Sequence, residues 1–308
     1  MKTHFRWLVL PVLLYAGCLL PACSKDKKSN VPGGSGSADR IFYSGNTAFK
    51  ILDLRSGTEK SIINNAAESH QERYDVARDG SQIVFYSESL TSDDITFTIY
   101  NADGGVIKTF RVGKYVSGIP KLSPDKSMIA FIWQPASTYP DKYVAVFSRD
   151  GRQLRAFKGV DDYAWTSDQR LLMVTSNAFY LSSADLSTAQ QLRNLNGLPE
   201  EPEQLDISRN DKRVAFVSGS HIWMINMDGS GLRQVTSSGN REWYPAWSPD
   251  DSRIYFNLDW TGNCLELRVI PSDAAQVINI DPHTDGPAPR IMLNGNRICS
   301  QSQPMARP

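Results

Sequence analysis

A short turn of the type Ser-Pro-Asp, set between an aromatic-ended strand and an apolar strand, recurs along this 308-residue sequence and limits what the chain can fold into. The clearest copy is Glu242–Phe256, EWYPAWSPDDSRIYF. Six copies align on one Asp or Asn of the turn, namely Asp79, Asp125, Asp168, Asn210, Asp250 and Asn294. These residues are 46, 43, 42, 40 and 44 residues apart, a period typical of four-stranded propeller blades.

The chemistry of the turn explains its composition. Proline at the second position fixes φ near −65°, and Asp or Asn at the third position hydrogen-bonds its own backbone. Asp-Gly pairs mark a later hairpin in three of the repeats, at Asp103-Gly104, Asp150-Gly151 and Asp228-Gly229. No long segment has helical periodicity, so we expect an all-β fold.

The repeats predict a six-bladed β-propeller of four-stranded blades, with seven blades as the alternative. The segment from Arg40 to Ile63 lacks the innermost strand of a blade, and the C-terminal sequence has one to spare. We therefore expect N- and C-terminal strands to share one blade, which closes the ring and leaves no free sheet edge. Arg40–Ser44 and Arg297–Ser300 compete for the second strand of that blade, so the closure register stays open.

The pattern resembles the TolB-type β-propeller repeat, whose usual form is an aromatic residue, Ser-Pro-Asp-Gly and then an apolar strand. Two copies match this form closely, Trp247-Ser-Pro-Asp250 and Leu122-Ser-Pro-Asp125. Two others have drifted from it, Thr166-Ser-Asp168 and Ser208-Arg-Asn210. The resemblance implies a protein or peptide ligand held at the mouth of the channel, in contact with components of the cell envelope.

The N-terminus has a different composition from the repeats. A basic start precedes an apolar run from Trp7 to Leu20, which is too short to span about 30 Å of hydrocarbon and is typical of a secretory signal. Leu20-Pro-Ala-Cys23 resembles the lipobox of bacterial lipoproteins, which implies a diacylglycerol on the Cys23 thiol. Cys18 is a weaker candidate, and a plain cleaved signal peptide is the alternative.

These features divide the chain into a lipoprotein signal peptide over 1–22, a flexible tether over 23–38 and a β-propeller over 39–308. The tether has one large apolar residue, Val31, and cannot bury enough surface to order itself. By the lipoprotein sorting rule, Ser24 favours the outer membrane of a Gram-negative bacterium. We expect an exported protein on the periplasmic or cell-surface side, anchored through Cys23.

Loops that enter the innermost strands of a propeller surround one mouth of its channel. Counting back from each turn yields acidic residues beside aromatic rings with polar tips, a combination typical of a binding rim. The predicted ligand-binding residues are Glu72, Arg73, Tyr74, Asp161, Asp162, Tyr163, Glu203, Glu242, Trp243 and Tyr244. The alternative is that the aromatic residues among them pack between blades.

Composition and motifs favour binding over catalysis. The chain has 33 basic and 33 acidic residues, and this balance gives no electrostatic case for nucleic acid. No catalytic motif is recognised, so we expect a monomeric binding module for an envelope protein or peptide, without catalytic residues or cofactor. The alternative is a glycan-binding lipoprotein or a metal-dependent carbohydrate-active propeller similar to oligogalacturonate lyases. Its metal ligands would be His70, His221 and His283, which lack local ligand spacing.

Two cysteines, Cys264 and Cys299, lie within the repeats. An exported protein permits a disulfide, which here would join the last full blade to the closing segment beside it. Two buried free thiols are the alternative.

Overall fold

The computed structural model describes residues 40–45, 48–64, 73–88, 95–113, 116–134, 141–176, 178–260, 264–300 and 302–308. Within these ranges the chain forms strands and turns and no α-helix. None of the described residues therefore belongs to a helix that is long and apolar enough to cross a membrane. The predicted signal peptide, Cys23 and tether lie outside the described residues.

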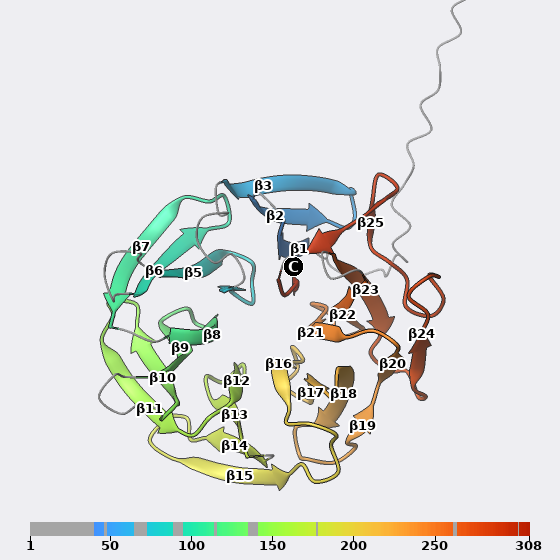
Figure 1. The fold of residues 1–308 in the computed structure, drawn as a ribbon. Coiled ribbons are helices and arrows are strands. Elements are labelled where there is room, and N and C mark those ends of the chain that lie inside the picture. Colours follow the sequence, from blue (N-terminus) through green and yellow to red (C-terminus); the bar gives the residue numbers. More distant parts are fainter. Residues whose placement is uncertain are drawn as a thin grey trace, which may run out of the picture.

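The described strands form a ring of six four-stranded antiparallel blades, which confirms the predicted propeller (Figure 1). Blade two consists, from the axis outward, of β4 (Tyr74–Val76), β5 (Gln82–Glu88), β6 (Ile95–Asn101) and β7 (Val106–Val112). Blade three consists, in the same order, of β8 (Val116–Leu122), β9 (Met128–Trp133), β10 (Tyr143–Ser148) and β11 (Gln153–Lys158). Blade four consists of β12 (Asp162–Trp165), β13 (Leu171–Thr175), β14 (Ala178–Ser182) and β15 (Ala189–Asn194). Blade five consists of β16 (Glu203–Ile207), β17 (Arg213–Ser218), β18 (His221–Asn226) and β19 (Arg233–Gln234). Blade six consists of β21 (Glu242–Trp247), β22 (Arg253–Asp259), β23 (Leu265–Pro271) and β27 (Cys299–Ser300).

Segments from both ends of the sequence form blade one, as predicted. Its strands from the axis outward are β28 (Met305–Arg307), β1 (Arg40–Ser44), β2 (Ala48–Asp53) and β3 (Thr58–Asn64). β28 pairs antiparallel with β1 and places Arg307 opposite Arg40. Of the two segments that competed for the second strand, 40–44 takes it, whereas β27 pairs with β23 at the outside of blade six.

The repeat copy predicted around Asn294 is wrong as a blade. These residues form a separate hairpin of β25 (Met292–Leu293) and β26 (Asn296–Arg297). Asn294 and Gly295 both have positive φ, at 52° and 81°, which is the tight hairpin turn that Asn-Gly favours. The likeness to the repeat turn is therefore local, and the innermost strand expected here is β28 instead. A further parallel pair joins β20 (Thr236–Ser238) to β24 (Ile278–Ile280).

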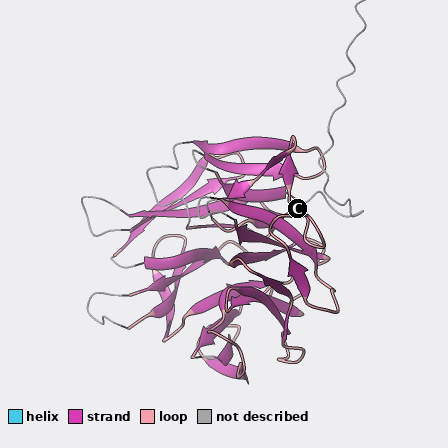
Figure 2. Ribbon diagram, turned by 45° about the vertical axis from the view of Figure 1, so that its right-hand side comes forward, coloured by secondary structure: helices cyan, strands magenta, loops and turns pink. Residues whose placement is uncertain are grey.

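The core of the protein lies between the blades. Strand β6 (ITFTIYN) alternates between buried and half-buried residues, because successive side chains of a strand point to opposite faces. Buried apolar side chains gather in six clusters, one for each pair of neighbouring blades. Between blades two and three, for example, the rings of Phe97 and Phe131 are 4.7 Å apart. Most residues of the perimeter strands β3, β7 and β11 are exposed, and so are all six residues of β15. Figure 2 shows the described chain as strands joined by loops and turns.

The turn after each innermost strand repeats one arrangement. In blade three the Ser123 hydroxyl and the Ser127 N–H donate to the Asp125 carboxylate at 2.7 and 3.0 Å. Equivalent hydroxyl bonds form in blades four, five and six. The next residue has positive φ in five blades, namely Gly80 (73°), Lys126 (64°), Gln169 (66°), Asp211 (54°) and Asp251 (59°).

Carboxylates on the innermost strands tie blades two, four and five to the blades that follow them. Asp75 accepts from the backbone N–H of Leu122 at 2.8 Å, and Asp206 accepts from that of Trp247 at 2.8 Å. Backbone N–H groups near the axis would otherwise lack a partner, and a charge-assisted bond satisfies them. These bonds fix the spacing of the innermost strands around the channel.

Candidate functional site

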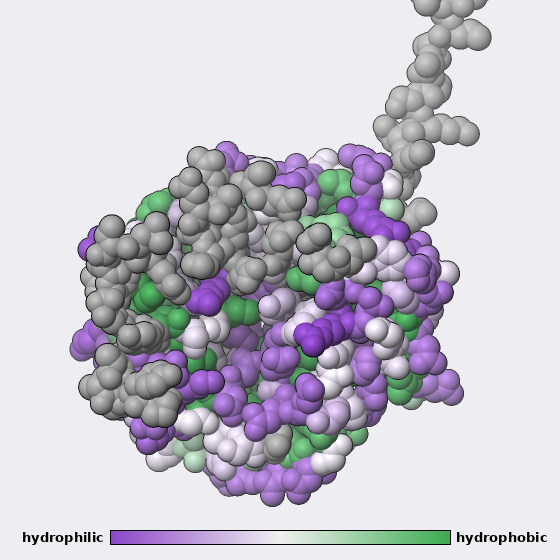
Figure 3. Space-filling model, viewed as in Figure 1, coloured by the Kyte–Doolittle hydropathy of each residue, from purple (hydrophilic) through white to green (hydrophobic). Residues whose placement is uncertain are grey.

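The innermost strands of all six blades surround a cavity on the ring axis, with an empty volume of about 650 Å³ that includes space open to solvent. One end, which we call the mouth, lies where the chain enters these strands, and Gln204 and Tyr244 line the cavity there. The other, which we call the turn end, is formed by the turns between first and second strands and is lined by Arg78 and Arg209. Viewed along the axis, the surface is mostly hydrophilic (Figure 3).

Backbone bulges shape the mouth. The pairing of β16 with β17 shifts between Glu203 and Asp206, and that of β21 with β22 shifts between Trp243 and Ala246. Within these bulges Gln204 and Tyr244 adopt φ of 58° and 55°. A bulge turns a side chain away from its regular direction, and positive φ is unfavourable for residues other than glycine. Both bulged residues therefore line the channel at a conformational cost.

Aromatic and charged groups meet on blade six at the mouth. The exposed Arg241 guanidinium lies 5.7 Å from the centre of the Trp243 ring, and this ring is 6.2 Å from that of Tyr244. Both aromatic side chains are half-buried. The backbone N–H of Tyr244 donates to Gln204 Oε1 at 2.6 Å, which links the bulges of blades five and six.

Acidic residues lie at the entrances to the neighbouring blades. Asp161 and Glu203 are exposed at the entrances to blades four and five. Asp162 is half-buried and accepts from the backbone N–H of Leu205 at 2.9 Å. Desolvation, followed by the charges of Asp162 and Glu200, raises the pKa of Glu203. The mouth is therefore acidic on this side.

Two predicted ligand-binding tyrosines belong to the core instead. Tyr74 and Tyr163 are 0% and 1% exposed. The Tyr74 hydroxyl donates to the carbonyl of Gln303, and the Tyr163 hydroxyl donates to the carbonyl of Ile119 at 2.6 Å. Burial is the first cause that raises the pKa of each. Both side chains point between blades, so the prediction that they contact a ligand is wrong.

Glu242 is also buried, contrary to its predicted place on the rim. Its carboxylate accepts from the Thr236 hydroxyl and from the backbone N–H of Ile222 at 3.1 Å, and it lies 3.5 Å from His221 Nδ1. Its side chain therefore holds β18 and β20 beside β21 and is not available to a ligand. The Glu242 carboxylate beside it raises the pKa of His221.

The remaining predicted residues lie apart. Arg73 donates to the Tyr86 hydroxyl at 2.5 Å, and His283 packs against the Trp260 ring at 4.8 Å between centres. Glu72 and His70 lie outside the described residues. Among the residues that the structure describes, no cluster of His, Cys, Asp or Glu side chains is arranged to hold a metal ion.

The structure joins Cys264 and Cys299 in a disulfide. Cys264 directly precedes β23, and Cys299 lies on β27, which pairs with β23. The bond therefore lies within blade six, whereas the sequence placed Cys299 in the neighbouring blade. It fixes the outermost strand of blade six just before the chain continues to β28.

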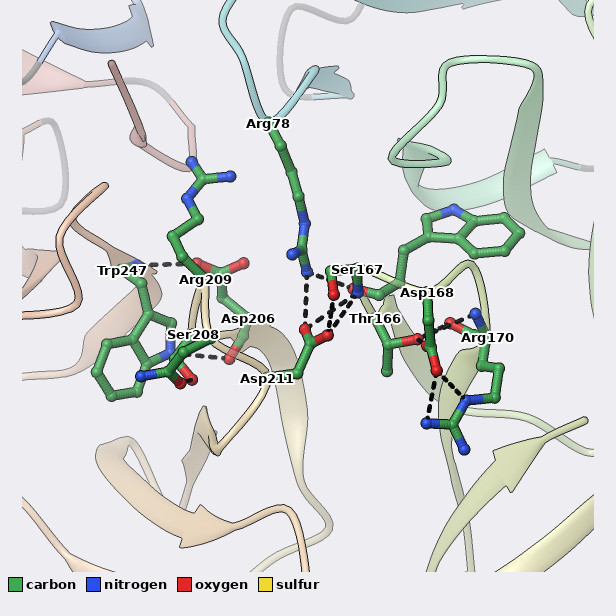
Figure 4. A network of polar contacts seen from close by, with 12 residues as sticks. Arg78, Thr166, Ser167, Asp168, Arg170, Asp206, Ser208, Arg209, Asp211 and Trp247 are labelled. Atoms are coloured by element: carbon green, nitrogen blue, oxygen red, sulfur yellow. Dashed lines mark hydrogen bonds and ion pairs between the residues drawn. The ribbon is translucent and has the colours of Figure 1, made fainter. Parts of the chain in front are cut away.

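Basic side chains at the turn end were missed by the sequence reasoning. Arg78 and Arg209 occupy the second position of the turn, where Pro124 and Pro249 stand in the regular copies. Figure 4 shows both reaching into the central space, with Arg78 close to Asp211. The drift from proline to arginine at this position was the available sequence signal.

The described residues form a six-bladed β-propeller, and its fold is similar to that of solved TolB structures. TolB from Acinetobacter baumannii superposes with a TM-score of 0.61 at 14% identity, over 89% of this chain and 68% of that one. A putative TolB from Agrobacterium tumefaciens superposes with a TM-score of 0.58 at 14% identity, over 88% of this chain and 98% of that one. A chain of a nidogen/laminin complex superposes with a TM-score of 0.57 at 10% identity, over 87% of this chain and 98% of that one. No sequence-family model and no curated protein sequence matches the chain. At these identities the likeness concerns the fold.

Proposed function

We propose that this chain is an exported, lipid-anchored binding module that holds a protein or peptide partner of the cell envelope at the mouth of its channel. The bulged residues Gln204 and Tyr244 carry the proposal, because both keep positive φ and both line the cavity. Unfavourable backbone conformations persist where the surrounding structure enforces them, and they concentrate at functional sites.

The chemistry of the mouth suits a peptide. Half-buried Trp243 and Tyr244 offer large rigid faces, and Arg241 and Glu203 offer charges of both signs at the rim. Trp, Tyr and Arg dominate the binding energy of protein interfaces. The TolB-like fold supports a role in the envelope, and one chain of similar fold belongs to a solved nidogen/laminin complex.

Site-specific photo-crosslinking in intact bacterial cells tests the proposal. A photoreactive residue placed at Trp243 is expected to capture one envelope protein, which mass spectrometry identifies. The matched control is the same residue at Val106, which is 62% exposed on the outer strand β7. Equal capture from both positions, or none from Trp243, contradicts a mouth site.

Titration with the purified partner then measures how much one residue of the mouth contributes to the affinity. Because an interface hot spot is worth about 2 kcal/mol or more, Tyr244→Ala is expected to weaken binding roughly thirtyfold. Calorimetric titration measures the change, with Val106→Ala as the control. Tight binding of oligogalacturonate in place of any protein would overturn the peptide assignment.

The anchor is tested separately at Cys23. Cys23→Ala is expected to abolish labelling by radioactive fatty acid and to leave the protein soluble or as an unprocessed precursor. Cys18→Ala is the control and should keep the label. Label that persists on Cys23→Ala contradicts this lipidation site.

A further inference from the structure

Two departures from the repeat place arginines at the turn end of the channel. Arg78 belongs to blade two and Arg209 to blade five, on opposite sides of the ring. Their guanidinium groups extend into the space between these blades (Figure 4). Both line the axial cavity. The regular turns carry proline at this position, which has no side-chain charge.

Two more cations line the same cavity, Lys121 on β8 and Arg307 on β28. The carboxylates that line it are Asp75 and Asp206, so four cationic side chains face two anionic ones. Asp75 lies 3.6 Å from Arg307 and also accepts a backbone N–H. Two further carboxylates lie at the turn end, since Asp211 is 3.5 Å from Arg78 and Asp251 accepts the backbone N–H of Arg209. A cavity walled by protein screens charge less than bulk water does, so the cationic side chains on its wall attract anions.

The protein neutralises these cations incompletely. Arg209 donates to one carbonyl, that of Ala306 at 3.0 Å. Lys121 Nζ donates to the carbonyls of Tyr163 and Leu205, each at 2.7 Å. Within the described residues neither side chain forms an ion pair with a carboxylate. A guanidinium carries five N–H donors and an ammonium three, so each keeps donors open to the cavity.

Arg209 lies among charges of both signs. Burial and the charges of Arg307 and Arg78 lower the pKa of Arg209 to about 9, while the charges of Asp206 and Asp251 act in the opposite direction. Arg78 is partly compensated, because it donates to the Trp165 carbonyl at 2.8 Å and lies 3.5 Å from Asp211. Arg209 remains protonated at neutral pH, and an anion beside it would offset the repulsion among the three guanidinium groups.

We propose that the turn end of the channel binds an oxyanion, a carboxylate or phosphate group, between Arg209 and Arg78. Guanidinium groups suit both because their planar N–H pairs match two oxygen atoms at once. The site lies at the opposite end from the mouth, and its test is independent of any partner bound there.

Titration of the purified protein with inorganic phosphate and with succinate tests the site. At matched ionic strength, one or both should raise Tm and give a saturable heat by calorimetry, whereas sodium chloride should not. Arg209→Gln is expected to weaken binding about tenfold or more, since a charge-assisted bond is lost. Arg209→Lys should retain part of the affinity. The matched control is Arg155→Gln on the exposed outer strand β11.

The responses to phosphate and to succinate identify which kind of oxyanion the site binds. Binding of phosphate alone points to a phosphorylated ligand, and binding of succinate alone points to a carboxylate, and either supports the site. Arg78→Gln provides a second variant if Arg209→Gln does not fold. An equal response to phosphate, succinate and chloride overturns the proposal, as does an equal affinity of Arg209→Gln and Arg155→Gln.

Discussion

The two tryptophans of β21 lie four residues apart and belong to different kinds of surface. Trp247, near the turn end, is 0% exposed, donates its indole N–H to the Asp206 carbonyl at 3.1 Å, and has Arg213 stacked at 4.5 Å. Trp243, at the mouth, is half-buried beside the exposed Arg241. Near the turn end blades two to six share one turn arrangement, whereas at the mouth bulges shift the innermost strands of blades three, five and six and leave those of blades two and four regular. The turns that the blades share stabilise the ring, and the residues that differ from blade to blade are the candidates for ligand binding.

The first prediction separates the two tryptophans directly. Trp247→Ala is expected to lower the free energy of unfolding by about 3–5 kcal/mol, because it leaves a large cavity between blades five and six. Trp243→Ala should lower it by less than about 1 kcal/mol. Urea unfolding measures both. Equal costs would show that Trp243 belongs to the core and would remove the contrast between mouth and turn end.

The disulfide should come next in size. Cys264 and Cys299 are 35 residues apart, and in the chain-entropy model such a link stabilises by about 3–4 kcal/mol. The Cys264→Ser/Cys299→Ser double variant should therefore lower Tm, and reduction should lower the Tm of the wild type alone. Two titratable thiols in the native, unreduced protein would contradict the bond.

A smaller effect concerns the ties between neighbouring turns. Asp251 accepts from the backbone N–H groups of Arg209 and Asn210 at 2.5 and 3.0 Å. Asp251→Ala leaves both donors unpaired and should cost about 2–3 kcal/mol. Asp251→Gly should cost roughly 1 kcal/mol less, because the position has a φ of 59° that glycine adopts freely. Equilibrium unfolding of the two variants checks the order, and a lower stability for Asp251→Gly would contradict it.

The smallest effect is the pH dependence at His221. Its contact with Glu242 raises the pKa of His221 above 6.5, so the folded protein holds this proton more tightly than the unfolded chain. The stabilisation is complete below the unfolded pKa and is lost as the pH rises through the folded value. The Tm difference between wild type and His221→Gln should therefore shrink from about pH 6 to about pH 8. A constant difference would show that the pair carries no charge interaction.

The blades could be predicted because each contains the same turn, whose residues bond one another locally. The closing strand could not be, since Met305–Arg307 has three residues and no alternating pattern of its own. The Asn294-Gly295 pair suggested the wrong segment for the innermost strand of blade one, because a hairpin turn needs the same residue types as the repeat turn.

The mouth was harder to predict than the blades. Counting a fixed number of residues back from each turn assumes an unbroken strand, and each bulge shifts the alternation of side chains. Tyr74 and Tyr163 therefore face the core, whereas Tyr244 reaches the channel from within a bulge. The sequence does not show whether a tyrosine hydroxyl bonds water or a buried carbonyl. Only the three-dimensional structure distinguishes an exposed tyrosine from a buried one.

Ring closure by β28 also sets the order in which the protein can fold. Arg40 Nε donates to the Pro308 carbonyl at 2.6 Å across a separation of 268 residues. Contacts between distant residues form slowly, because the loop must close before any contact repays the lost chain entropy. Blades two to six consist of strands between residues 74 and 300, but blade one cannot gain its innermost strand until residues 305–307 are in place. We therefore expect Arg307 to join the wall of the channel late in folding.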